Sequence, residues 1–304
     1  MADERDEGSG GEVMIETIKS VQDHETAKRY RATVLSSERI TPEASDEEVR
    51  ELVLEVDRDD FPYEVGQSIG VVAPGQAKMG QKEHYRLYSV ADLPETSDSG
   101  KPRIKIAVRR CFYIDDYSGE RYPGVASNYL CDLTPGDAIT LTGPFGLAFE
   151  VPDETDANLI LIGSSTGIAP FRAFVKHLHQ NVPDWNGRVW LFYGAKSGLE
   201  MLYMNEEKDD FQQYYDKDTF EAFRALSPRP NWADPIAWDL AIKDRGDELW
   251  NMLGDPKTYV YVAGLEKMSG ELDKIFAKLA ESPEKWKRRK AELVAGKRWM
   301  ELLY

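Results

Sequence analysis

The segment Asn158-Leu-Ile-Leu-Ile-Gly-Ser-Ser-Thr-Gly-Ile-Ala-Pro-Phe-Arg172 decides the fold of the second half of the chain. It begins with an apolar run, continues through a glycine-bounded turn that carries hydroxyl groups, and ends in the first turn of a helix. Pro170 suits the first helical position, where its missing N–H costs nothing. A glycine-containing turn between a strand and a helix presents backbone N–H groups to a phosphate. We therefore predict a nucleotide-binding turn at residues 163–172.

From this segment to the C-terminus, strands and helices alternate. The pattern predicts strands at 158–162, 188–193, 221–226 and 258–263, and helices at 170–180, 205–215, 238–253 and 269–281. Near-continuous apolar strands that alternate with helices predict a parallel sheet covered on both faces. The second half of the chain is therefore expected to be an α/β parallel-sheet domain.

The first half has a different rhythm. Short runs rich in Val, Ile, Leu and Tyr occupy 31–40, 48–56, 68–72, 86–90, 101–108 and 138–141, with Pro and Gly between them. This pattern is typical of an antiparallel β-barrel or sandwich, with one short helix at 126–132. Residues 1–26 are rich in acidic residues and glycine, which predicts a largely disordered extension. We therefore predict a barrel domain at 27–153 and an α/β domain at 154–304.

Composition limits the function. A length of 304 residues suits two domains. A net charge of −16 argues against nucleic acid as a partner. No apolar run approaches the roughly 20 residues of a membrane span, and the N-terminus lacks a signal pattern. With Cys111 and Cys131 as the only cysteines, we expect a cytoplasmic protein without a four-thiolate cluster. His177 and His179 have no further ligands nearby in sequence, so we predict no metal site.

Two segments of the first half point to one ligand. Arg86-Leu-Tyr-Ser89 places a cation, an aromatic ring and a hydroxyl on one short strand. An arginine can clamp a pyrophosphate through two hydrogen bonds. Gly124-Val-Ala-Ser-Asn128 opens the short helix and leaves backbone N–H groups free for a phosphate. Taken alone, the first motif also fits an edge strand with an ion pair, and the second an ordinary turn capped by serine.

These segments, with Gly143-Pro-Phe-Gly146 and the turn at 163–172, resemble the plant-type ferredoxin–NADP⁺ reductase family from about residue 30 to the C-terminus. Residues 124–133 are similar to a stretch of the branch that contains the benzoyl-CoA oxygenase reductase component. The resemblance implies a ferredoxin reductase-like fold in which the barrel binds FAD and the parallel-sheet domain binds NADP(H).

The resemblance also implies roles for individual residues. Arg86 holds the FAD pyrophosphate, Tyr88 stacks on the flavin ring and Ser89 lies near its reactive nitrogen. Tyr113 falls where relatives place a tyrosine on the adenine, although a partly buried strand tyrosine is an equal alternative. The implied FAD-binding residues are Arg86, Leu87, Tyr88, Ser89, Ala107, Val108, Arg109, Tyr113, Gly124, Val125, Ala126, Ser127 and Tyr304.

The nicotinamide nucleotide is expected at the carboxyl ends of the parallel strands. Ser227 and Arg229 supply a hydroxyl and a cation for a 2′-phosphate, which favours NADPH, whereas Asp239 leaves NADH possible. Ala263 stands where family members usually carry a cysteine. The implied nucleotide-binding residues are Thr166, Gly167, Ala195, Lys196, Ser227, Arg229, Gly264 and Leu265.

The resemblance implies that three residues act in catalysis. Ser89 lies at the edge of the flavin ring, Tyr304 covers its second face, and Glu301 is the candidate proton carrier. For the partner, we predict an acidic ferredoxin or flavodoxin. Its docking patch is expected on one basic run, for which a solvated helix face is an equal alternative. The run contains Lys285, Lys287, Arg288, Arg289 and Lys290.

The sequence therefore predicts a FAD-dependent oxidoreductase that transfers electrons between NADP(H) and a one-electron carrier. Two alternatives stay open. One is the NAD(P)H-dependent reductase component of a multicomponent oxygenase. The other is a flavin-bearing interaction subunit of a redox complex, whose nicotinamide site is weakened at Ala263.

Overall fold

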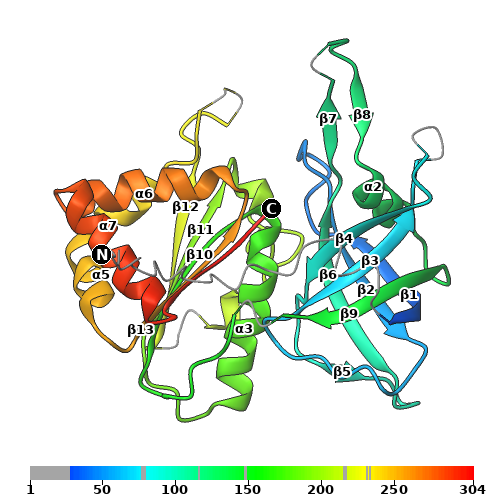
Figure 1. The fold of residues 1–304 in the computed structure, drawn as a ribbon, viewed down its shortest axis with the longest axis horizontal. Coiled ribbons are helices and arrows are strands. Elements are labelled where there is room, and N and C mark those ends of the chain that lie inside the picture. The colour runs from blue at the N-terminus through cyan, green and yellow to red at the C-terminus, as the bar shows by residue number, and fades with distance from the viewer. Residues whose placement is uncertain are drawn as a thin grey trace, which may run out of the picture.

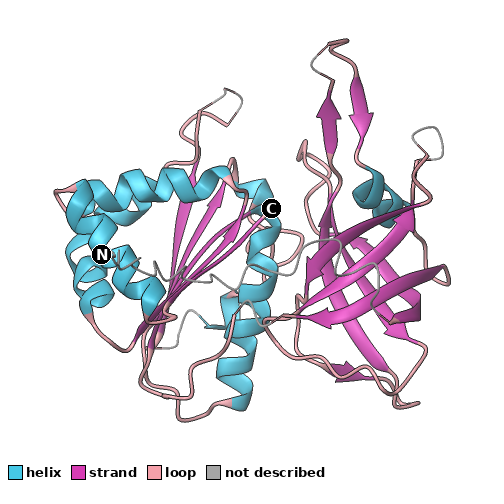
Figure 2. Ribbon diagram, viewed as in Figure 1, coloured by secondary structure: helices cyan, strands magenta, loops and turns pink. Residues whose placement is uncertain are grey.

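A computed structural model describes residues 28–76, 80–115, 117–146, 149–214, 218–230, 232 and 234–304. The predicted extension at 1–26 lies outside these residues. The described chain forms an antiparallel barrel and a parallel-sheet domain that lie side by side (Figure 1, Figure 2). This arrangement confirms the predicted two-domain fold class. No helix in the described part of the chain has the length and apolar character of a membrane span.

The barrel is a seven-stranded sheet in the order β4-β3-β9-β1-β2-β6-β5. The strands are β1 (Arg29–Arg39), β2 (Val49–Val56), β3 (Ser68–Pro74), β4 (Glu83–Ser89), β5 (Glu95–Thr96), β6 (Pro102–Arg109) and β9 (Ala138–Phe145). An antiparallel bridge between Val90 and Ile106 joins the end of β4 to β6 and closes the barrel. Alternate strand residues fill its interior, where Val34, Leu52 and Ile104 are fully buried.

Two smaller elements sit at one end of the barrel. The helix α2 (Val125–Asp132) packs against β3 and β4. The strands β7 (Phe112–Ile114) and β8 (Arg121–Pro123) pair as a two-stranded ribbon that projects away from the barrel (Figure 1). The ribbon was not predicted, because its strands are short and largely exposed.

The second sheet is fully parallel in the order β12-β11-β10-β13-β14. Its strands are β10 (Asn158–Ser164), β11 (Val189–Ala195), β12 (Phe220–Leu226), β13 (Thr258–Gly264) and β14 (Trp299–Leu303). The short turn η2 (Ser165–Gly167) and the helix α3 (Ile168–Asn181) follow β10. The strand order reverses at β10, because β11 and β12 lie on one side of it and β13 and β14 on the other. Such sheets bind ligands at the carboxyl ends of the strands beside this reversal.

Helices cover both faces of this sheet. α3 packs its apolar side on one face through Phe171 and Phe174. The other face carries α4 (Trp238–Lys243), α5 (Gly246–Gly254), α6 (Lys267–Leu279) and α7 (Pro283–Ala295). The arrangement gives the continuous burial of β11 that its apolar sequence predicted.

Three local predictions need correction. The helix expected at 205–215 is absent from the described residues; turns and the short η4 (Gln212–Tyr214) occupy this region. The side chain of Asn205 accepts hydrogen bonds from the backbone N–H groups of Glu207 and Lys208, which favours a turn. The helix expected at 238–253 is divided into α4 and α5. α3 begins at Ile168, so Pro170 is its third residue, where its missing N–H is still harmless.

A buried ionic network joins the two domains at Arg172 of α3. Its side chain is 5% exposed, and its guanidinium lies 3.0 Å from an oxygen of Asp92 and 2.5 Å from one of Asp210. It also donates a 2.6 Å hydrogen bond to the carbonyl of Ala91. Asp92 and Ala91 follow barrel strand β4, whereas Arg172 and Asp210 belong to the parallel-sheet domain. The charge pairing therefore spans the junction.

Asp92 gathers cations from both domains. Lys176 of α3 lies 2.5 Å from one of its oxygens, and Lys105 of β6 lies 2.9 Å from the other. Burial alone would raise the pKa of Asp92, but Arg172 and the two lysines outweigh burial and hold this pKa well below its usual range. The carboxylate is therefore ionised and fully paired.

Glu51 of β2 makes a second set of polar contacts across the domain junction. Its carboxylate accepts hydrogen bonds from Lys208, at 2.6 Å, and from the hydroxyl of Tyr203, at 3.0 Å. The ring of Tyr203 also lies under the guanidinium of Arg172, at 4.6 Å. Because a buried charge is costly without its partners, these contacts fix one relative orientation of the domains.

We predict that Arg172→Ala lowers the free energy of unfolding by about 3–5 kcal/mol, because it leaves buried carboxylates without their shared cation. Urea unfolding followed by tryptophan fluorescence measures the loss. Arg188→Ala is the control, because it breaks an exposed ion pair with Glu248 and should cost less than about 1 kcal/mol. Equal losses in the two variants would contradict a structural role for the network.

Candidate functional site

The motif Arg86–Ser89 lies on β4, at the edge of the barrel sheet. Strand alternation directs Arg86 and Tyr88 to one face and Leu87 and Ser89 to the other. Among the described residues, Arg86 has no acidic partner, and its guanidinium donates a hydrogen bond to the carbonyl of Tyr85. An exposed arginine fork that is not neutralised by a carboxylate fits an anionic group such as a pyrophosphate.

The start of α2 offers a second anion-binding feature beside β4. The Gly124 N–H donates a 2.9 Å hydrogen bond to the carbonyl of Cys111. This bond links the start of the helix to the base of the projecting ribbon. Within the described chain, the next N–H groups, those of Val125, Ala126 and Ser127, have no acceptor, and no acidic residue lies in the first helical turn. Ser127 does not cap the helix; its hydroxyl accepts from the N–H of Cys111, at 3.2 Å. These N–H groups fit phosphate oxygens.

The end of β6 brings small residues to the junction. Ala107 is buried and packs with Ala91 of the barrel and Ala169 of α3 in one small cluster. Val108 is buried in the barrel core, and Arg109 pairs with Glu47 at 3.4 Å. Three alanines allow the start of α3 to approach β6 closely. The predicted flavin segment and the predicted nucleotide turn are therefore neighbours.

Tyr304 reaches this junction from the C-terminal end of the sheet. Its backbone N–H donates to the carbonyl of Gly264, at 2.9 Å, and its hydroxyl lies 2.6 Å from that of Thr166. The residue keeps 52% of its surface exposed, but its hydroxyl end lies near Arg109. Burial of this end raises the pKa of Tyr304, and the bond with Thr166 and the charge of Arg109 oppose the rise. The terminal side chain therefore contacts the nucleotide turn and feels the charge of Arg109 in the predicted flavin segment.

Two glycines shape the nucleotide turn. A Cβ at Gly167 would lie 2.2 Å from the carbonyl oxygen of Ala263, so only glycine permits the turn to pack against β13. Gly264 has φ +148° and a Cβ there would lie 2.4 Å from the Ser164 hydroxyl. The carbonyl of Ser165 accepts from the hydroxyl of Tyr193 at 3.0 Å, which anchors the turn to β11.

The remaining predicted nucleotide residues lie at the carboxyl ends of the strands. Ala195 ends β11 and is buried, and Lys196 follows it exposed. Ser227 follows β12 and its N–H donates to the carbonyl of Ala195. Arg229 is exposed and makes two hydrogen bonds to Asp234. Leu265 follows Gly264 at the end of β13. The strand ends thus gather these residues at one edge, and Asp234 is an addition that the sequence did not indicate.

Glu301 does not join this group. β14 alternates, so Glu301 lies on the sheet face opposite to Leu302 and Tyr304. Its carboxylate accepts hydrogen bonds from Trp299, at 2.6 Å, and from Ser269, at 3.1 Å, and it pairs with Lys290 at 3.1 Å. All three partners belong to α6, α7 or β14. These contacts hold Glu301 away from Tyr304 and give no support to the predicted proton-carrier role.

Tyr113 lies on the projecting ribbon and is 47% exposed, so it is not the partly buried residue of the alternative prediction. It stacks on Tyr122 with ring centroids 5.6 Å apart. The exposed tyrosine pair presents a flat aromatic surface. Tyr122 is a possible contact residue that the sequence analysis did not single out.

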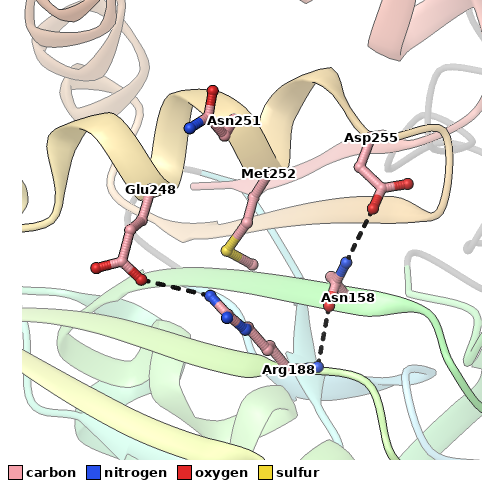
Figure 3. Close-up of a pocket in the computed structure, with 6 residues that line it drawn as sticks. All are labelled: Asn158, Arg188, Glu248, Asn251, Met252 and Asp255. Atoms are coloured by element: carbon pink, nitrogen blue, oxygen red, sulfur yellow. Dashed lines mark hydrogen bonds and ion pairs between the residues drawn. The ribbon is translucent and has the colours of Figure 1, made fainter.

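Two cavities accompany these features. One of about 470 Å³ lies beside the end of β6 and is lined by Arg109, Arg110, Cys111 and acidic residues of the β1–β2 loop. The other, of about 430 Å³, lies at the amino ends of β10 and β11, and its lining includes an ion pair between Arg188 and Glu248 and a contact between Asn158 and Asp255 (Figure 3). Since ligands bind at the carboxyl ends of parallel strands, the second cavity is on the wrong edge for a nucleotide.

The comparisons with known proteins agree with this geometry. The family model of the oxidoreductase NAD-binding domain matches residues 161–274. A ferredoxin–NADP reductase from Spirulina sp. is 32% identical and covers 89% of this chain and 93% of its own length. One from Picosynechococcus sp. is 33% identical over 83% of this chain. The chain spans 64% of that relative and 66% of a Synechocystis relative.

Solved structures show the same fold. A ferredoxin–NADP⁺ reductase from Plasmodium falciparum aligns with a TM-score of 0.68 at 21% identity, and the alignment covers 91% of this chain and 97% of that one. The identity of 32% across 93% of the Spirulina protein shows that the chain belongs to the ferredoxin–NADP reductase family.

Proposed function

We propose that this protein is a FAD-dependent oxidoreductase that transfers electrons between NADP(H) and a one-electron carrier, an acidic ferredoxin or flavodoxin. The proposal is supported by relatives that are ferredoxin–NADP reductases and by donor groups that fit each cofactor. Bound FAD supplies the exchange between two-electron and one-electron chemistry. We place it in the barrel domain at 27–153 and the nucleotide in the domain at 154–304.

The observation that carries the proposal is the position of Tyr304. It bonds to Thr166 of the nucleotide turn and lies near Arg109 at the end of β6. Hydride exchange requires two ligands in direct contact. A removable aromatic residue between the two sites meets this requirement, because it shields one ligand from water until the other displaces it.

Separate groups hold the two ligands. In the barrel, the Arg86 fork and the α2 N–H groups bind the pyrophosphate, while Tyr88 and Ser89 lie toward the ring. In the sheet domain, the N–H groups at the start of α3 and the hydroxyl of Thr166 face the nucleotide. Because the ion pair between Arg172 and Asp92 links α3 to the barrel, the two sets of groups keep a fixed position relative to each other.

The proposed carrier requires a source of attraction, because the protein is itself acidic. On α7, Lys290 pairs with Asp273 and Glu301, and Arg288 pairs with Glu292. Lys285 and Lys287 have no acidic partner among the described residues. α7 lies on the side of its domain away from the barrel (Figure 1). We therefore propose that the basic run, Arg289 included, steers the carrier at long range rather than seating it beside the flavin. A cytoplasmic location remains a prediction.

The first experiment is anaerobic reduction of the purified flavoprotein by NADPH and by NADH, followed by loss of flavin absorbance. We expect rapid reduction by NADPH and slower reduction by NADH. Flavin that neither nucleotide reduces would contradict the oxidoreductase and support the interaction-subunit alternative. Fast reduction by NADH alone would instead favour the oxygenase-reductase alternative.

Arg86→Ala should weaken flavin retention by about 10- to 100-fold, because charge-assisted hydrogen bonds to the pyrophosphate are lost. Arg86→Lys keeps the charge without the two-pronged geometry and should fall between. Equilibrium dialysis of FAD measures both. Arg58→Ala, an exposed barrel arginine paired with Asp60, is the control and should retain FAD normally. Full retention by Arg86→Ala would overturn the assigned role.

The paired charge reversal Lys285→Glu and Lys287→Glu should slow the second-order reduction of a plant-type ferredoxin several-fold at low ionic strength. The difference should vanish in high salt, where the Debye length is about 3 Å at 1 M. Lys28→Glu with Lys101→Glu makes the same change in net charge on the barrel. An equal effect of both pairs, or none, would show that α7 presents only a solvated face.

A further inference from the structure

The loop after β12 holds a cation, a carboxylate and an aromatic ring together. Arg229 donates from Nε to Oδ2 of Asp234, at 2.7 Å, and from Nη2 to Oδ1, at 3.1 Å. Its guanidinium carbon lies 5.0 Å from the centroid of Trp232. Trp232 is itself 68% exposed. The arginine is therefore held in one orientation at the surface by a planar ion pair and by a ring face.

This cluster is fastened to the edge where the nucleotide is expected. The Ser227 hydroxyl donates to the backbone carbonyl of Asp234, at 3.2 Å. The N–H of Ser227 donates to Ala195 of β11, and the N–H of Ala237 donates to Leu226 at the end of β12, both at 3.3 Å. The loop thus closes on the carboxyl ends of two parallel strands, beside which the ribose of a bound nucleotide lies.

The carboxylate occupies an edge of Arg229 that could otherwise bind a phosphate through two hydrogen bonds. Asp234 takes the edge formed by Nε and Nη2, and Nη1 makes no hydrogen bond to a residue that the structure describes. A 2′-phosphate has two ways to reach this cation. It can displace Asp234, which forfeits the ion pair, or it can bind at Nη1 with a carboxylate close by, which costs repulsion between like charges. Either route weakens the contribution of the phosphate.

We propose that Asp234 is a specificity-determining residue of the nucleotide site. Its carboxylate competes with a 2′-phosphate for Arg229, lowers the affinity for phosphorylated nucleotides, and leaves the affinity for unphosphorylated ones nearly unchanged. The inference rests on the proposed nucleotide site and predicts a weaker preference for NADPH over NADH than Arg229 would give without this carboxylate. Asp239, the acid that the sequence singled out, is exposed in the first turn of α4 and has no contact with Arg229 among the described residues.

The test measures binding of 2′-phospho-AMP and of AMP to the full-length flavoprotein by titration calorimetry. Asp234→Asn keeps the size of the side chain and the backbone carbonyl that holds Ser227, but it removes the charge. We expect this variant to bind 2′-phospho-AMP about five- to ten-fold more tightly than the unaltered protein, with AMP affinity changed less than about two-fold. The gain should shrink as salt rises.

Two further variants test whether the gain in affinity depends on net charge or on Arg229. Asp244→Asn removes one exposed carboxylate at the end of α4 and should leave both affinities unchanged, which controls for net charge. Arg229→Gln should abolish most of the preference for 2′-phospho-AMP. In an Arg229→Gln background, Asp234→Asn should give no gain, because the two residues act through one contact.

Specific outcomes overturn the inference. An unchanged affinity of Asp234→Asn for 2′-phospho-AMP would show that the carboxylate does not compete. A weaker affinity would show that Asp234 instead orients Arg229 for the phosphate. An equal gain in Asp244→Asn would reduce the effect to net charge. If neither compound bound any variant or the unaltered protein, the nucleotide site itself would be wrong, and that failure is distinct from the first three.

Discussion

The buried guanidinium of Arg172 constrains the arrangement of the whole molecule. It is almost fully removed from solvent, and a charge in that position is stable only with its carboxylates in place. Those carboxylates come from both domains. Any rotation of one domain against the other separates Arg172 from Asp92 and from Glu51, which belong to the barrel domain. Since α3 begins directly after the nucleotide turn, the network that holds α3 also sets the position of Thr166 against the barrel.

The sequence predicted the parts of the site that depend on local chemistry. The strand with Arg86, the turn with Gly167, and the start of α2 are short segments in which neighbouring residues perform one task. Parallel and antiparallel sheets were likewise distinguishable, because their hydrophobic periods differ. The helix predicted at 205–215 was wrong, because a packed loop can have the same apolar spacing as a helix. In this loop the side chain of Asn205 accepts backbone hydrogen bonds that favour a turn.

Other features were beyond the sequence because they join distant segments. Nothing near Arg172 in sequence indicates that Glu51 and Asp92 face the same junction. The family resemblance suggested Glu301 as a proton carrier, yet its position on β14 directs it to Lys290, on the sheet face opposite to Tyr304. Likewise, the pairing of Arg229 with Asp234 depends on how one loop folds back. The role of a charged residue therefore depends on partners that are distant in sequence and become neighbours only in the fold.

Ala263 stands where the family resemblance implies a cysteine, and the contacts around it are made by the backbone. The carbonyl of Ala263 lies against Gly167, and the carbonyl of Gly264 receives the N–H of Tyr304. These contacts involve main-chain atoms and glycines, so they do not depend on the side chain at 263. The nucleotide turn, the end of β13 and the terminal ring therefore keep their alignment without sulfur. A cysteine, which the family resemblance implies for this position, would place a polarisable, titratable group beside the turn. For this reason we expect a change at Ala263 to act on the rate of electron transfer more than on the binding of nucleotide.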